Sequence, residues 1–113
     1  MTWLILHRSS EAAVSRAASA AAANDRDRVV SALREAAHFE TEAMAAADDP
    51  SAGRTYGITA VSAVALWLKA GDHARALEVA GECLRGNRLP PFARHHLIDM
   101  LETGVTEFGI GQL

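Results

Sequence analysis

The chain has 113 residues and a formal net charge of −3. This length fits one domain with a modest core, and the mild acidity argues against a nucleic-acid-binding surface. Half of the residues are hydrophobic but only 5% are aromatic, because alanine supplies much of the apolar content. Alanine is the best helix former and buries little area, so we expect well-formed, closely packed helices with little room for strands.

Residues 1–8 form an N-terminal arm in this interpretation. The apolar run from Trp3 to Leu6 is too short for the core of a signal peptide, and Arg8 follows the run instead of preceding it. No stretch approaches the length that crosses a bilayer, so a cytoplasmic protein without a membrane partner is expected. We expect the arm, helical or extended, to dock Trp3 and Leu4 on the helices or on another subunit.

A first hairpin is expected over residues 9–49. Ser9 or Ser10 can cap a first helix that runs to about residue 23. The cap formers Asn24 and Asp25 then predict a turn and the start of a second helix. A continuous helix from Ser10 to Ala47 is the alternative, because neither glycine nor proline interrupts it. The second helix ends before residue 50, where a proline cannot continue it.

The second hairpin is expected over residues 51–87, with helices at about 52–70 and 72–85. Gly71 can adopt a positive φ at the end of the first of these helices, and Asp72 can cap the next one. Small and aromatic side chains recur at helical spacing on the facing sides of both helices. They define a predicted hairpin core of Ala63, Trp67, Gly71, Ala76, Ala80 and Cys83.

This hairpin resembles a tetratricopeptide repeat, on the small residue Ala63 or Val64, the aromatic Trp67, the Gly71-Asp72 turn, and the small residues Ala76 and Cys83. The chain departs from the family pattern at three places. His73 replaces the usual tyrosine, Ala80 replaces an aromatic residue, and Pro90-Pro91 come a few residues late. An ordinary antiparallel helical bundle is the alternative architecture.

The resemblance implies a concave face lined by the first helix of each hairpin. On the second hairpin, the corresponding candidate groove residues are Ile58, Val61, Ala65, Leu68 and Lys69. Some members of the family grip a ligand's terminal carboxylate there with Lys and Asn, but Val61 and Ala65 occupy two of those positions. The face is apolar instead. The chain's own first helix or arm can cover it, or it can take an amphipathic helix or apolar peptide, or form a dimer.

A terminal helix is expected over residues 90–103, opened by Pro90 or Pro91 at its first position. The tail, residues 104–113, is expected to be mobile unless Phe108 and Ile110 dock on the helices.

The polar residues give little indication of chemistry. Cys83 is the only cysteine, which excludes an internal disulfide and suits a small core residue in a reducing compartment. Glu35, His38 and Glu42 share one helical face, and Glu35-x-x-His38 is half of the pattern that binds two metal ions in four-helix bundles. The sequence contains no second copy of this pattern. His95, His96 and Asp99 on the last helix could in principle add ligands to such a metal site. They suit it poorly, because adjacent helical residues point about 100° apart. We therefore expect no metal, no cofactor and no enzymatic activity.

The sequence thus predicts an all-α protein of about five helices, arranged as tetratricopeptide-like antiparallel hairpins. The predicted function is a non-catalytic protein-protein interaction module that binds a helical or apolar segment of a partner protein. Two and a half hairpins are few for a solenoid, so self-association, most simply as a homodimer, or a permanent partner is expected. A structural homo-oligomeric bundle subunit and a small chaperone-like adaptor are the alternatives.

Overall fold

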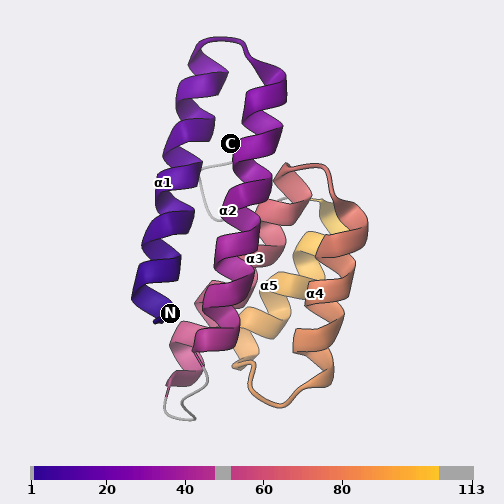
Figure 1. Ribbon diagram of the computed structural model, residues 1–113. Helices are drawn as coiled ribbons and strands as arrows, with labels where there is room; N and C mark the ends of the chain where they lie inside the picture. The colour runs from indigo at the N-terminus through magenta and orange to yellow at the C-terminus, as the bar shows by residue number, and fades with distance from the viewer. Residues whose placement is uncertain (1, 48–51, 105–113) are drawn as a thin grey trace.

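The computed structural model describes residues 2–47 and 52–104. These ranges contain five α-helices and no strand. The helices are α1 (Trp3–Ala22), α2 (Arg26–Ala46), α3 (Gly53–Lys69), α4 (His73–Arg85) and α5 (Pro91–Thr103). Successive helices run antiparallel and pack as hairpins (Figure 1). The predicted all-α class and antiparallel hairpin architecture are confirmed.

The first helix begins earlier than the sequence predicted. α1 starts at Trp3 because Thr2 has an extended backbone and its hydroxyl accepts a hydrogen bond from the Ile5 amide at 3.4 Å. The predicted start at Ser9 or Ser10 is therefore wrong, and residues 3–8 of the predicted arm are helical. The hydroxyls of both serines donate to main-chain carbonyls instead of capping a helix.

The turn between α1 and α2 lies at the predicted place. Asn24 has a φ of 56°, and the Asp25 carboxylate accepts a hydrogen bond from the Arg28 amide at 3.2 Å. The alternative of one continuous helix is wrong. Alanines dominate the buried side chains of this hairpin, and they include Ala13, Ala17, Ala20, Ala32, Ala36 and Ala43. Such small side chains allow the two helices to approach closely.

The turn between α3 and α4 also has the predicted chemistry. Gly71 has a φ of 81°, and the Asp72 carboxylate accepts a hydrogen bond from the Arg75 amide at 3.0 Å. The other members of the predicted hairpin core are buried in the structure: Ala63, Trp67, Ala76, Ala80 and Cys83. The main core forms where α3 packs between α2 and the pair α4 and α5.

α5 begins beside the start of α3. Pro91 occupies the first turn of α5, as predicted, and the preceding Pro90 contacts Gly57 of α3. α5 then runs in the same direction as α3 and ends at Thr103; the next residue, Gly104, caps the helix with a φ of 73° (Figure 1). The expected contacts of Phe108 and Ile110 lie outside the described residues.

Candidate functional site

An open groove of about 730 Å³ runs between α1 and α3, with α5 at one edge. The α3 wall consists of Ile58, Val61, Ser62, Ala65, Leu66 and Lys69. The α1 wall consists of His7, Ser10, Glu11, Val14, Ser15 and Ala18. Glu40 of α2 and the α5 residues Phe92 and His96 complete the lining. We call this feature the α1–α3 groove.

The structure brings most of the predicted groove residues together. Ile58, Val61, Ala65 and Lys69 line the α1–α3 groove because they share one face of α3. Leu68 does not line it. This residue lies at the margin of that face, and its half-buried side chain packs against the hydrophobic core.

The walls of the groove present apolar side chains to solvent. Val14 is 40% exposed, Ile58 is 47% exposed and Phe92 is 37% exposed, so α1, α3 and α5 each offer one such residue. Val61 and Leu66 are buried beneath them. An apolar, concave surface with charged residues at its margins is the usual form of a peptide-binding groove.

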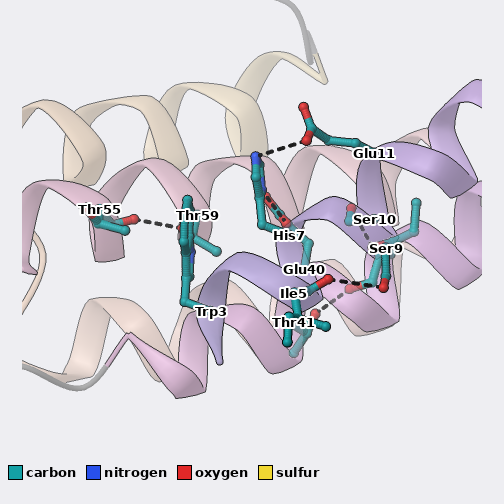
Figure 2. A network of polar contacts seen from close by, with 12 residues as sticks. Trp3, Ile5, His7, Ser9, Ser10, Glu11, Glu40, Thr41, Thr55 and Thr59 are labelled. Carbon is teal, nitrogen blue, oxygen red and sulfur yellow. Dashed lines mark hydrogen bonds and ion pairs between the residues drawn. The ribbon is translucent and has the colours of Figure 1, made fainter. Parts of the chain in front are cut away.

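A buried carboxylate lies in the lining of the groove. Glu40 is only 1% exposed, and its Oε1 atom forms a hydrogen bond with Nδ1 of His7 at 3.0 Å (Figure 2). On the other side of the ring, Nε2 of His7 lies 3.8 Å from Oε1 of Glu11. A carboxylate removed from water needs such a partner, because an unpaired buried charge is strongly destabilising.

Sequence reasoning missed this pair. Glu40 occupies the position between Ala36 and Ala43 on the buried face of α2, and this placement on an otherwise apolar stripe was the available signal. The contact with His7 depends on how α1 and α2 are aligned with each other. Helical periodicity within a single segment does not determine that alignment.

Trp3 joins α1 to α3 beside the groove. Its indole Nε1 donates to Oγ1 of Thr59 at 2.9 Å, and its ring stacks on His7 with a centroid separation of 4.8 Å and an interplanar angle of 8° (Figure 2). The Thr59 hydroxyl donates in turn to the Thr55 carbonyl. The expected docking of Trp3 on the helices is thus observed, whereas Leu4 is exposed and does not dock on the helices of its own chain; its docking on another subunit stays a prediction.

The residues considered as metal ligands make other contacts. Glu35 forms an ion pair with Arg16 at 2.8 Å, and His38 meets the ring of Trp67 edge-on. The rings of His95 and His96 lie 6.3 Å apart and are tilted by 46°. Within the described ranges, no three histidine, cysteine or acidic side chains are grouped so that they could hold a metal ion.

The single cysteine lies in the core, away from the groove. The Cys83 thiol is buried and lies 3.3 Å from the sulfur of Met44. Burial raises the pKa of this thiol above its ordinary value. Burial, followed by a hydrogen bond with Cys83, also raises the pKa of Tyr56 to about 12. The guanidinium of Arg88 lies 4.1 Å from the centre of the Tyr56 ring.

Comparisons with protein-family models, with curated proteins and with solved structures found no match. None of the helices in the described ranges is both long enough and apolar enough to cross a membrane.

Proposed function

We propose that this protein is a non-catalytic interaction module whose α1–α3 groove binds a helical or apolar segment of a partner protein. The observation that carries the proposal is the exposure of Val14, Ile58 and Phe92 on three walls of one concave surface. When a ligand covers these apolar side chains and removes them from water, the complex is stabilised by roughly 25 cal/mol per Å² of buried apolar area.

The order of the helices supports the same proposal. α1, α3 and α5 line the groove, and each is the first helix of a hairpin or of the half-hairpin that follows. The resemblance of the second hairpin to a tetratricopeptide repeat implies a ligand face on these helices. We therefore propose a tetratricopeptide-like module. A cytoplasmic location is part of the proposal and is supported by the single cysteine, Cys83, which is buried in the core and suits a reducing compartment.

The margins of the groove favour an amphipathic ligand. Charged side chains of Glu11 and Lys69 flank the apolar lining, so a partner helix can place apolar residues inside and polar residues toward solvent. Glu40 forms a hydrogen bond with His7, so the buried Glu40 side chain supports the α1 wall of the groove.

The test uses a fluorescein-labelled amphipathic helix of leucine and glutamine as a neutral probe, titrated by fluorescence anisotropy. Ile58→Glu places a charge in the groove and should weaken binding at least about tenfold, which corresponds to about 1.4 kcal/mol. Leu77→Glu is the matched control, because Leu77 is 58% exposed on α4 and does not line the groove. Equal affinities of the two variants, with circular dichroism unchanged, would contradict the proposal.

A structural homo-oligomer is the second candidate function, and the same exposed residues favour it. If the groove is buried between two copies, light scattering should show a dimer for the native chain and for Leu77→Glu. The Ile58→Glu variant should then be monomeric. A native chain that remains monomeric at high concentration would remove this candidate.

A further inference from the structure

The ring of His7 is held in a fixed orientation in the wall of the α1–α3 groove. It stacks on the indole of Trp3 with centroids 4.8 Å apart, and Trp3 in turn donates a hydrogen bond to Thr59 of α3. The Nδ1 atom of His7 lies 3.0 Å from Oε1 of Glu40, a side chain that is only 1% exposed. The ring is therefore fixed on one face and at one nitrogen, so a ligand that contacts it has little left to order.

The hydrogen bond to Glu40 determines the roles of the two ring nitrogens of His7. An ionised carboxylate only accepts hydrogen bonds, so Nδ1 carries the hydrogen and donates it to Oε1 of Glu40. In the neutral ring the other nitrogen, Nε2, is then an acceptor. The buried carboxylate thus presents an acceptor nitrogen on the opposite side of the ring.

Nε2 of His7 and the carboxylate of Glu11 form a pair of acceptors that face each other. Oε1 of Glu11 lies 3.8 Å from Nε2, and both residues line the groove (Figure 2). Two acceptors cannot bond to each other, but one donor nitrogen can lie about 2.9 Å from each of them. The side chains are 30% exposed for His7 and 66% exposed for Glu11, so a ligand can reach them. We call this pair the His7–Glu11 notch.

The charges around the notch favour a cation. Among the described residues, the carboxylates of Glu11 and Glu40 and the ammonium of Lys69 are the charged groups that line the groove. Both carboxylates lie next to the ring of His7. Glu40 is shielded from water, so its charge is screened less than that of a surface carboxylate. A positive group in the notch is attracted by both carboxylates, whereas a negative group is repelled.

We propose that the His7–Glu11 notch binds the ammonium group of a lysine on the partner helix, while the apolar face of that helix covers Val14, Ile58 and Phe92. The ammonium donates one hydrogen bond to Nε2 of His7 and another to the carboxylate of Glu11. This inference rests on the proposed function, because a helix in the groove brings the lysine to the notch. It narrows the partner to an amphipathic helix with a lysine beside its apolar stripe.

The test uses the neutral leucine and glutamine probe and a series of probes in which one glutamine at a time is replaced by lysine. Fluorescence anisotropy is measured at about 0.15 M salt, where long-range attraction is screened. Lysine at one position should increase the affinity at least about fivefold, because only one position along the helix reaches the notch. Lysine at the other positions should have a smaller effect, and glutamate at the preferred position should weaken binding.

Two variants of the full chain assign the effect to the notch. Glu11→Gln removes an exposed carboxylate and should abolish the advantage of the best lysine probe, while the affinity for the neutral probe stays the same. His7→Asn keeps an N–H donor for Glu40 and removes Nε2, so it should reduce the advantage as well. Glu42→Gln is the matched control, because Glu42 is exposed on α2, does not line the groove and carries the same charge. This control should keep the full advantage.

Three results would overturn the inference: an equal gain at every lysine position, an advantage that persists in Glu11→Gln, or an equal loss in Glu42→Gln. The neutral probe separates this failure from that of the proposed function. If Ile58→Glu weakens binding of the neutral probe but no lysine position is preferred, the notch inference fails and the interaction module stands. If neither the neutral probe nor any lysine probe binds, the proposed function fails and the inference fails with it.

Discussion

The indole of Trp67 forms a hydrogen bond with Thr41 across the interface between α3 and α2, with Nε1 donating to Oγ1 at 3.0 Å. The Thr41 hydroxyl donates onward to the carbonyl of Ala37 at 2.7 Å. The ring of His38 forms a T-shaped contact with the indole, with centroids 4.8 Å apart and an interplanar angle of 79°. One buried side chain therefore connects the second hairpin to the first by packing and by a satisfied polar contact.

Replacing Trp67 with alanine should lower the free energy of unfolding by about 3–5 kcal/mol, because it leaves a large cavity between the hairpins. Urea denaturation followed by circular dichroism measures the change. Trp67→Phe serves as the comparison, since it keeps most of the buried ring and loses the hydrogen bond to Thr41. A loss below about 1 kcal/mol for the alanine variant would show that the indole is not a core anchor.

Gly57 should resist enlargement although it lies within a helix. A Cβ atom at this position would stand 2.8 Å from Cγ of Pro90 and 3.0 Å from Cβ of Ala93. Gly57→Ala gains about 1 kcal/mol of helix propensity. We expect the crowding of α5 to outweigh this gain and to produce a net loss of about 1–2 kcal/mol.

Gly53→Ala is the control for this prediction. Gly53 begins the same helix, and a Cβ atom there would meet no atom within 4 Å. The thermal midpoint of this variant should stay equal to that of the native chain or rise. If Gly57→Ala is equally stable, then α5 can move away from α3 at little cost.

The Cys83 thiol should react slowly with alkylating reagents in the native protein. Burial both blocks access and raises the thiol pKa, so less thiolate exists at a given pH. Labelling with iodoacetamide at pH 8, followed by mass spectrometry, should be much faster in urea than in buffer. Ser19→Cys, at an exposed position of α1 that does not line the groove, should react rapidly in both. Native labelling of Cys83 at the unfolded rate would mean that α4 opens readily.

Ionisation of Tyr56 should lower the stability of the fold at high pH. Its pKa is raised from 10.0 to about 12 in the folded protein, so the unfolded chain loses this proton first. Its contribution to stability is complete below pH 10 and declines as the pH rises toward 12. Urea midpoints measured from pH 8 to pH 11 should fall more steeply for the native chain than for Tyr56→Phe. Identical slopes would show that Tyr56 is not the responsible group.

Local signals in the sequence predicted most of the architecture. The turns at Asn24-Asp25 and Gly71-Asp72 were predicted because their side chains cap helices or tolerate a positive φ. Pro91 marked the start of α5 in the same way. The start of α1 was misplaced because its capping residue, Thr2, precedes an apolar run without helical periodicity.

The groove could be predicted only in part. The resemblance of the second hairpin to a tetratricopeptide repeat implied which face of α3 carries Ile58, Val61 and Ala65, and these three positions lie within one helix. Leu68 was wrongly assigned to the groove, because which residues of α3 line the groove depends on how closely α1 approaches α3. The contact between His7 and Glu40 joins two helices, so it follows from their packing and not from either segment alone.

The close packing of α1 against α2 limits which substitutions this sequence can accept. Alanines such as Ala13, Ala17 and Ala36 are buried between the two helices, where a larger side chain would push α1 outward. Since α1 is also a wall of the groove, such a change would alter the width of the groove as well as stability. Accepted substitutions at these positions should therefore be limited by volume more than by polarity, with serine tolerated better than valine or leucine.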